Sequence, residues 1–274
     1  MSRGAIQTLP AGQWRVGASG SRRIERALPE EAAIGISYDS EPYAVLMATP
    51  ADLADLATGF TISERIAAAG DILDVRIGEH EAGFVADVLL SPAGRRTAGD
   101  RRRRNLEGRS SCGLCGVQRP EDALRALPRL APGFRVGREA VQSALAALSA
   151  EQVLGQATHA THAAGWADAS GALRLVREDI GRHNALDKLI GAGARTGLDA
   201  ASAFFVITSR CSYEMVEKTV TAGAPLLVAI SAPTDLAVRM AAAANLTLIA
   251  LARADGHMVF AGAERIAGEA VLDA

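Results

Sequence analysis

Three short segments decide the fold: Ala203-Phe204-Phe205-Val206-Ile207-Thr208, Pro225-Leu226-Leu227-Val228-Ala229-Ile230 and Leu246-Thr247-Leu248-Ile249-Ala250-Leu251. Each is almost continuously apolar, which is typical of a strand that is buried on both faces of a sheet. Patterns typical of helices follow the first two segments, over residues 212–222 and 234–244. Strands of this kind that alternate with helices predict an α/β fold, with helices on both faces of the sheet.

Further elements are expected on both sides of these strands. Residues 161–168 and 172–177 resemble two strands joined as a hairpin across Ala169-Ser170-Gly171. The other elements expected in this half are helices over residues 120–126, 137–149 and 184–191 and a short strand over residues 258–260. Ligands on such sheets usually bind where strands end and helices begin, so we expect the functional site at that edge.

The N-terminal part of the chain has a different pattern, which predicts a small α+β unit. Its strand-like and helical segments lie at residues 34–38, 43–47, 50–60, 74–77 and 83–90. The helix is expected to end near Gly59, and residues 61–69 are expected to continue as helix or turn. Residues 1–20 are polar and small, and we expect the first few to be frayed. We therefore expect a smaller N-terminal α+β domain over residues 1–108, a mobile loop over residues 109–118 and an α/β domain over residues 119–274.

The composition of the 274 residues narrows the class of protein. Hydrophobic residues make up 49% and aromatics only 4%, so the core must consist mostly of Ala, Val, Leu and Ile. The formal net charge of −2 argues against nucleic acid as a partner. No segment approaches the ~18 consecutive apolar residues of a membrane helix, and no secretory signal is seen. Three cysteines form no disulfide framework and fit a reducing cytoplasm.

A glycine-bracketed CxxC motif, Ser111-Cys112-Gly113-Leu114-Cys115-Gly116, carries the most reactive chemistry of the chain. It follows an arginine-dense stretch over residues 95–109, and nearby positive charge favours the thiolate form of cysteine. The whole segment lacks a hydrophobic period, so we expect an exposed loop whose glycine backbone lets a partner's sulfur approach closely. Sulfur carriage or redox exchange at Cys112 and Cys115 is the interpretation we favour.

Other interpretations of this motif stay open. A structural zinc ion needs about four nitrogen or sulfur ligands, and the only other cysteine, Cys211, is distant in the sequence. A thioredoxin-like dithiol would open a helix after a strand, whereas this motif follows arginines. The arginines form either a solvated loop or a docking surface for an acidic partner or a polyphosphate.

The densest polar run is Arg177-Glu178-Asp179-Ile180-Gly181-Arg182-His183-Asn184-Ala185-Leu186-Asp187-Lys188, at a predicted joint between strand and helix. Free backbone amides at the helix start, together with the Arg182 guanidinium and His183, suit an anion. The alternative is an ordinary helix with Asn184 as its N-cap. We favour an anion site because many hydrogen-bonding groups converge at this joint.

Two further strand ends carry similar residues, Thr208-Ser209-Arg210-Cys211-Ser212 and Ser231-Ala232-Pro233-Thr234-Asp235. Three such ends on one edge would gather hydroxyls, an arginine and helix N-termini, which suits a phosphate-bearing ligand. Simple helix capping is the alternative, and it is stronger for residues 231–235. Cys211 is expected to be a packed thiol. His159 and His162 are a weak signal for a metal, and we expect one to be a polar site residue and the other structural.

Together these residues resemble the formate dehydrogenase accessory sulfurtransferases, the FdhD family, over nearly the whole chain. The most specific segment is the run over residues 176–188, which is too long to match by chance. The other segments that carry the resemblance are Gly59-Phe60, Ser63-Glu64, residues 111–116, His162-Ala163-Ala164, Thr208-Ser209-Arg210, Ser212-Tyr213-Glu214-Met215, Ser231-Ala232-Pro233-Thr234 and residues 260–266.

The resemblance implies a fold and an activity. The C-terminal α/β domain would be cytidine-deaminase-like but without the catalytic zinc, and the zinc-deaminase signature is indeed absent from the sequence. The protein would be a sulfurtransferase that takes sulfur as a cysteine persulfide from a cysteine desulfurase. It would pass the sulfur to the molybdenum bis(molybdopterin guanine dinucleotide) cofactor of formate dehydrogenase, a bound substrate, and hold no metal of its own. A cytoplasmic homodimer is expected.

The resemblance also implies roles for individual residues. Cys112 would carry the persulfide, and Cys115 would assist or be dispensable. The cofactor-binding segment would be Phe260-Ala261-Gly262-Ala263-Glu264-Arg265, and we expect the guanine nucleotide ends near Arg182, His183, Ser209 and Arg210. Much of the family has a small residue without sulfur at position 211, so Cys211 is taken as incidental.

Two other functions stay open at this point. The protein could be a chaperone that binds the molybdenum cofactor without carrying sulfur, and persulfidation of Cys112 distinguishes the two functions. A zinc-stabilised binding module is a weaker alternative, which metal analysis would decide.

Overall fold

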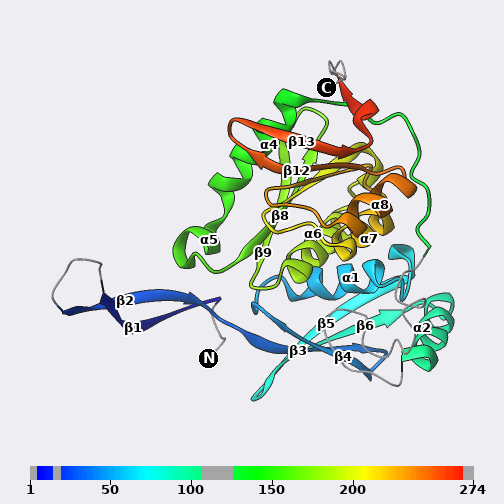
Figure 1. Cartoon of the computed structure of the whole chain (residues 1–274). Helices are drawn as coiled ribbons and strands as arrows, with labels where there is room; N and C mark the ends of the chain where they lie inside the picture. The colour runs from blue at the N-terminus through cyan, green and yellow to red at the C-terminus, as the bar shows by residue number, and fades with distance from the viewer. Residues whose placement is uncertain (1–4, 15–19, 106–125, 268–274) are drawn as a thin grey trace.

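The computed structural model describes residues 5–14, 20–105 and 126–267 (Figure 1). The loop expected over residues 109–118, with Cys112 and Cys115, lies outside the described residues, as does nearly all of the helix expected over residues 120–126. The two largest sheets have six strands in the C-terminal part and four in the N-terminal part. The structure is therefore a mixed α/β protein, as predicted.

The larger sheet has the strand order β13-β12-β11-β10-β8-β9. Its strands are β8 (His162–Asp168), β9 (Leu173–Asp179), β10 (Ala203–Ile207), β11 (Leu226–Ala229), β12 (Thr247–Arg253) and β13 (Gly256–Ala261). β10, β11 and β12 run parallel to one another, and they are the apolar segments that predict the α/β fold. Every residue of β10 and β11 is buried, which confirms that both faces of the sheet are covered.

Helices cover the two faces of this sheet and enclose two separate cores. One face carries α6 (Arg182–Thr196), α7 (Tyr213–Ala222) and α8 (Asp235–Ala243), and the other carries α4 (Arg138–Glu151). Phe205 of β10 packs into the first core, and its neighbour Phe204 packs into the second. Successive side chains of a strand point to opposite faces, so each buried strand contributes to both cores.

Short elements complete the C-terminal part: β7 (Val136–Gly137), α5 (Val153–Thr158), and the segments Ala200–Ser202, Ala263–Arg265 and β14 (Ile266–Ala267). β14 pairs with β7 in parallel, so the last described residues are tied to the start of α4. Across the described ranges, every helix is too short or too polar to span a membrane.

The smaller sheet has the strand order β4-β3-β6-β5. Its strands are β3 (Ala32–Tyr38), β4 (Glu41–Ala48), β5 (Ile72–His80) and β6 (Gly83–Leu90). α1 (Leu53–Ser63) packs Leu56, Ala57 and Phe60 into the core of this sheet. A short helical turn at Ala69–Asp71 leads into β5. The strands and the helix agree with the predicted α+β unit.

The first described residues form a hairpin that the sequence pattern does not predict. β1 (Ile6–Trp14) pairs with β2 (Ser21–Pro29), and in Figure 1 the hairpin extends away from both large sheets. Most of its side chains are exposed, including those of Leu9 and Trp14. A strand that is exposed on both faces has no alternation of apolar and polar residues, so the main sequence signal for a strand is missing.

Part of the arginine-rich segment is a helix rather than the expected loop. α2 (Pro92–Asn105) contains Arg95 and Arg96. Proline is favoured in the first turn of a helix, and the Ser91 hydroxyl accepts the backbone N–H of Gly94 at 3.1 Å. Arginine and alanine are good helix formers, so a helix can form here without a hydrophobic period.

The two parts of the chain meet where α1 crosses α6, and this crossing requires glycine. A Cβ atom on Gly59 would lie 1.7 Å from the carbonyl oxygen of Asp187, and one on Gly191 would lie 1.9 Å from that of Asp55. Such distances are impossible, so the helices pack backbone to backbone. The expected helix end near Gly59 is therefore wrong: α1 continues to Ser63, because this glycine serves the helix crossing.

Candidate functional site

The carboxyl ends of β9, β10 and β11 lie at one edge of the larger sheet, beside the start of β8. Strand pairing places His162 opposite Asp179, and the backbone N–H of Ile230 donates to the carbonyl of Ile207 at 3.0 Å. The loops that follow β10 and β11 are joined by a bridge between Cys211 and Pro233. We call this region the strand-end edge, and it is where the sequence predicts the site.

Many polar side chains of residues 177–188 do not face the strand-end edge but contact the N-terminal part. Arg177 Nε donates to Asp55 Oδ2 at 2.8 Å. Asn184 Nδ2 donates to the carbonyl of Met47 at 2.8 Å. The run that predicts an anion site is therefore largely used to join the two parts of the chain.

A buried lysine, Lys188, fixes the backbone between β9 and α6. Its Nζ lies 2.7 Å from Asp179 Oδ2 and donates to the carbonyl of Thr49 at 3.0 Å. Asp179 also accepts the backbone N–H of Gly181 at 2.8 Å. A buried charge is stable only when it is paired and hydrogen-bonded, as here. Gly181 is the N-cap of α6, so the alternative that Asn184 caps the helix is wrong.

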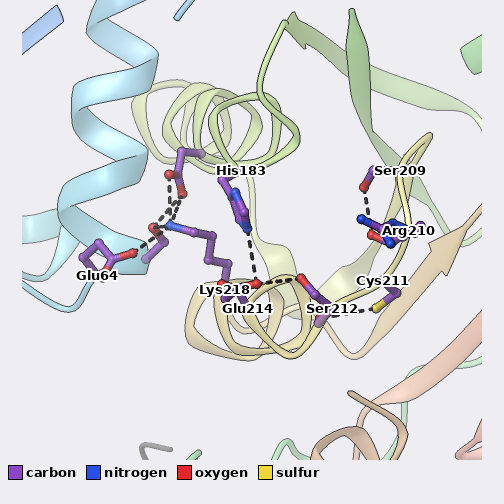
Figure 2. Close-up of polar contacts among 10 residues, drawn as sticks. Glu64, His183, Ser209, Arg210, Cys211, Ser212, Glu214 and Lys218 are labelled. Atoms are coloured by element: carbon purple, nitrogen blue, oxygen red, sulfur yellow. Dashed lines mark hydrogen bonds and ion pairs between the residues drawn. The ribbon is translucent and has the colours of Figure 1, made fainter. Parts of the chain in front are cut away.

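A second buried lysine, Lys218, joins α7 to the end of α1 (Figure 2). Its Nζ donates to Ser63 Oγ at 2.8 Å, to Glu64 Oε1 at 3.0 Å and to both carboxylate oxygens of Asp187 at 3.0 Å. Burial alone would lower the pKa of Lys218, but Asp187 and Glu64 outweigh it and raise the pKa. The pKa of Asp187 is raised, because the effect of burial exceeds the opposing effects of Lys218 and Ser63. Contact with both oxygens indicates a charged pair, because a neutral carboxyl would accept less strongly.

Arg182 and His183, in the first turn of α6, lie at the strand-end edge with His162. The pKa of His162 is lowered, mainly by burial and then by the charge of Arg182, while Asp179 acts in the opposite direction. The Nε of Arg182 is buried and has no hydrogen-bond partner in the described part of the chain. Cationic donors without acceptors suit an anionic group.

The structure distinguishes the two histidines whose roles the sequence leaves open. His162 lies at the strand-end edge and is half-buried, and its pKa is lowered. His159 is exposed and ends α5 in a left-handed conformation with φ 56°. His162 is therefore the histidine of this pair that belongs to the candidate site.

Ser209, Arg210 and Cys211 follow β10 at the same edge (Figure 2). Ser209 is buried and its hydroxyl donates to the carbonyl of Arg210 at 3.0 Å, whereas the Arg210 side chain is exposed. Burial raises the pKa of Cys211 to about 12. A thiol with this pKa is protonated and unreactive at neutral pH, which confirms Cys211 as a packed thiol.

The residues before α7 and α8 use their hydroxyls differently. Thr234 accepts the backbone N–H of Ala237 at 3.2 Å, so the capping interpretation of residues 231–235 is confirmed. Ser212 occupies the same position before α7 but caps no backbone N–H. Its hydroxyl donates instead to Glu214, which also contacts His183. Sequence reasoning missed this role of Glu214, because the residue is distant from His183 in the sequence and only the packing of α6 and α7 brings the two together.

The segment Phe260-Ala261-Gly262-Ala263-Glu264-Arg265 lies at the opposite edge of the sheet. β13 runs antiparallel to β12 and pairs Ala261 with Leu248, near the start of β12. The Arg265 side chain is 3% exposed and donates to the carbonyl of Ala131 at 2.9 Å, while Phe260 and Glu264 are exposed. Within one chain, the structure therefore does not bring this segment together with Arg182, His183, Ser209 and Arg210. Its role in cofactor binding stays a prediction.

A hollow of about 370 Å³ lies between the base of the hairpin, the start of α1 and α5. Its polar lining consists of the carboxylates of Asp52, Glu151 and Glu178. Glu178 already accepts the backbone N–H groups of Leu154 at 2.8 Å and Gly155 at 2.7 Å. An acidic lining disfavours phosphate, so the cationic strand-end edge is the better candidate for an anionic ligand.

The fold and the site define a mixed α/β protein whose strand-end edge is rich in cationic donors. The chain belongs to the FdhD/NarQ family, which it matches over residues 29–267. This finding confirms the resemblance that the sequence motifs carry.

Individual relatives agree with this assignment. The chain is 47% identical over 247 residues to the sulfur carrier protein FdhD of Xanthomonas campestris pv. campestris (strain B100), covering 90% of this chain and 88% of that protein. It is 43% identical over 266 residues to the sulfur carrier protein FdhD of Cupriavidus necator, covering 97% and 91%. A crystal structure of a candidate formate dehydrogenase accessory protein from Desulfotalea psychrophila has a similar fold, with a TM-score of 0.77, 22% identity, and 96% and 99% coverage.

Proposed function

We propose that this protein is a sulfurtransferase required for formate dehydrogenase activity. It takes sulfur from a cysteine desulfurase as a persulfide on Cys112 and transfers it to molybdenum bis(molybdopterin guanine dinucleotide), which is its bound substrate. Relatives that are named sulfur carrier proteins support the proposal that this protein carries sulfur. The proposal that it binds a nucleotide portion of the cofactor rests on the group of hydrogen-bond donors at the strand-end edge.

The sulfur chemistry needs one reactive thiolate. The Cys112 thiolate attacks the outer sulfur of the desulfurase persulfide, the sulfur–sulfur bond of the donor breaks, and the desulfurase cysteine leaves as a thiolate. Cys112 then holds the outer sulfur as its own persulfide. Cys115 assists this exchange or is dispensable. The buried Cys211 takes no part, because a thiol with a pKa of about 12 supplies almost no thiolate.

The strand-end edge is proposed to hold a guanine nucleotide end of the cofactor. Arg182 and Arg210 supply cationic donors, His183 lies beside Arg182, and the Ser209 hydroxyl donates to the carbonyl of Arg210. A phosphate oxygen would give the buried Nε of Arg182 the acceptor that it lacks within the described residues. The start of α6 adds backbone N–H groups that favour negative charge.

Three further expectations belong to the same proposal. Phe260-Ala261-Gly262-Ala263-Glu264-Arg265 contributes to cofactor binding, the protein is a cytoplasmic homodimer, and the C-terminal part is cytidine-deaminase-like. The segment from Phe260 and the strand-end edge lie at opposite edges of one sheet. We therefore expect that they bind different portions of the cofactor, or that each belongs to a site that a second copy of the chain completes.

Mass spectrometry after incubation with a cysteine desulfurase and cysteine tests the proposal. The wild type is expected to gain the mass of one sulfur atom at Cys112, Cys115→Ala is expected to gain it as well, and Cys112→Ala is expected to gain none. Cys211→Ala is the control, because the buried thiol should not contribute. If no cysteine gains sulfur while guanine nucleotide still binds, the protein is instead a chaperone for the molybdenum cofactor.

A further inference from the structure

The hairpin of β1 and β2 has little support from the rest of its own chain. Its two nine-residue strands form a sheet of their own, which extends away from the larger sheets in Figure 1. Within the described residues, its one hydrogen bond to another element runs from the Arg26 guanidinium to the carbonyl of Thr158 in α5, at 3.4 Å. A lone two-stranded hairpin is at best marginally stable in water, so a further contact would stabilise it.

The far end of the hairpin carries an exposed tryptophan and an exposed arginine on one face. Trp14 is 74% exposed, although its ring lies over Gly12, where a Cβ atom would be 2.9 Å from it. Gly12 pairs with Arg23, and residues that lie opposite each other in a sheet share a face. Arg23 is exposed and has no ion pair among the described residues. Tryptophan and arginine are enriched in protein–protein interfaces and among the residues that contribute most to binding.

The base of the same hairpin offers the opposite charge. The hollow described above is lined by the carboxylates of Asp52, Glu151 and Glu178. Asp52 lies 3.7 Å from a neighbouring arginine, and Glu178 accepts backbone N–H groups of α5. Glu151, in contrast, is exposed and has no partner within the described part of the chain. Val153, which also lines the hollow, is 71% exposed. The hollow therefore presents a free carboxylate beside an exposed apolar side chain.

The two ends of the hairpin are complementary in charge but cannot meet within one chain. The described strands carry three arginines and one glutamate, a net charge of +2, whereas the described lining of the hollow contains carboxylates and no Lys or Arg. The hollow lies at the base of the hairpin, where Ala5 directly precedes β1. Nine residues of strand, at about 3.3 Å each, place the far end ~30 Å from this base.

A two-fold axis resolves this mismatch between the ends. When two hairpins lie side by side and antiparallel, the far end of each reaches the base of the other, so both contacts form at once. An interface of this kind is self-complementary, as in most closed dimers. A second copy of the chain is therefore an occupant whose charges and dimensions match the hairpin.

We propose that a second copy of this chain covers the hairpin, with Arg23 of each copy against Glu151 of the other and Trp14 against Val153. This inference rests on the homodimer expected under the proposed function and deepens it, because it assigns the interface. It is independent of the sulfur chemistry and of the nucleotide site.

Sedimentation velocity over a range of protein concentrations tests the inference with four proteins: the wild type, Arg23→Glu, Glu151→Arg and the double variant. The wild type is expected to sediment as a dimer. Each single change brings like charges together at both contacts, and it is expected to weaken the dimer at least about tenfold. The double variant exchanges the two charges and is expected to recover most of this loss. Thermal unfolding checks that every variant is folded.

An equal mixture of the Arg23→Glu and Glu151→Arg proteins provides the sharpest test. It is expected to form dimers at concentrations where each protein alone is monomeric, because a mixed dimer has opposite charges at both contacts. A contact within one chain would not produce this recovery. Arg239→Glu is the matched control, since it reverses an exposed charge on α8, and it is expected to change the dissociation constant less than twofold.

Two results would overturn the inference, and they differ in what else they reject. If the wild type is a dimer but the single variants dimerise equally well, or the mixture shows no recovery, the assigned interface is wrong and the expected homodimer stands. If the wild type is monomeric at every concentration, the expected homodimer is wrong as well. Persulfidation of Cys112 is measured separately, so neither result decides whether the protein carries sulfur.

Discussion

The α1–α6 crossing and the strand-end edge both use residues of the run 177–188, yet their polar groups differ in whether they have hydrogen-bond partners within the protein. At the crossing, Asp187 and Lys188 are buried and find partners within the protein. At the edge, the Nε of Arg182 and the Nδ1 of His183 have none among the described residues. Asp187 and Lys188 are therefore satisfied within the protein, whereas the Nε of Arg182 at the edge is not.

Structural and functional polar residues of one motif therefore differ in whether the protein itself supplies their partners. Buried polar groups without partners cost free energy, so a protein keeps them only where something else compensates. The positions in the run alternate between the two uses because an α-helix presents successive residues to different sides. Perturbing the crossing should therefore change stability, and perturbing the edge should change ligand binding.

The largest effect is expected at the crossing from Lys218→Met. The change leaves the buried carboxylate of Asp187 without its cation, and it should lower the free energy of unfolding by about 3–5 kcal/mol. Urea denaturation measures this. The loss should be smaller at low pH, because the unpaired Asp187 would have a raised pKa in the folded state and would be neutral there.

The control for this change is Arg239→Ala, which removes an exposed ion pair with Asp235 on α8. Exposed pairs contribute little, so a loss below about 1 kcal/mol is expected. Equal losses from Lys218→Met and Arg239→Ala would contradict the structural importance of the buried lysine.

A second large effect at the crossing is expected from Gly59→Ala. The added Cβ would lie 1.7 Å from the carbonyl oxygen of Asp187, so the helices must separate, with a loss of about 3 kcal/mol. Gly99→Ala, in the middle of α2, meets nothing within 4 Å and should be neutral or slightly stabilising. Thermal unfolding of both variants provides the comparison, and a harmless Gly59→Ala would show that the two helices are not in backbone contact.

At the edge, Arg182→Ala should reduce affinity for GDP about tenfold, which corresponds to ~1.4 kcal/mol, and leave stability nearly unchanged. The reason is that its Nε has no acceptor within the described part of the chain. Calorimetry and urea denaturation of the same preparation separate the two effects. Unchanged affinity together with a large loss of stability would place Arg182 among the structural residues.

A smaller effect distinguishes the two helix starts. Thr234→Ala removes the hydroxyl that accepts the N–H of Ala237 and should cost about 1 kcal/mol of stability without changing GDP binding. Ser212→Ala removes no cap and should instead weaken GDP binding, because its hydroxyl holds Glu214 against His183 at the proposed nucleotide site. If Thr234→Ala weakened GDP binding and Ser212→Ala lowered only stability, the two hydroxyls would have the opposite roles.

The smallest expected effect is a change in the titration of His162. Its pKa is lowered from 6.5, first through burial and then through the charge of Arg182, so Arg182→Ala should raise the pKa. The unfolded chain binds this proton at higher pH than the folded one, so His162 reduces stability as the pH falls below 6.5. Nuclear magnetic resonance of the ring signals measures the shift, and no change would place Arg182 far from His162.

The sequence predicts the buried strands of the larger sheet well, because burial on both faces leaves continuous apolar runs such as β10 and β11. It does not predict the hairpin of β1 and β2, whose side chains are mostly exposed. It also misplaces the end of α1, because Gly59 has the appearance of a helix end and in fact permits contact with α6.

For the site, the sequence predicts that Arg182, His183, Ser209 and Arg210 lie at strand ends, and the structure places them at one edge. It could not show which polar residues of the run would turn toward α1, since that depends on the packing of two distant segments. Nor could it pair Glu214 with His183, because they are brought together only when α6 and α7 pack on the same face of the sheet.

The most direct test of the account is the response of the histidine ring signals to GDP, followed by nuclear magnetic resonance. His162 and His183 should shift on saturation, while His80, in β5, and His257, which contacts Gln142, should not. That result would locate the guanine nucleotide at the strand-end edge. Binding of GDP that leaves the signals of both His162 and His183 unchanged would contradict the account.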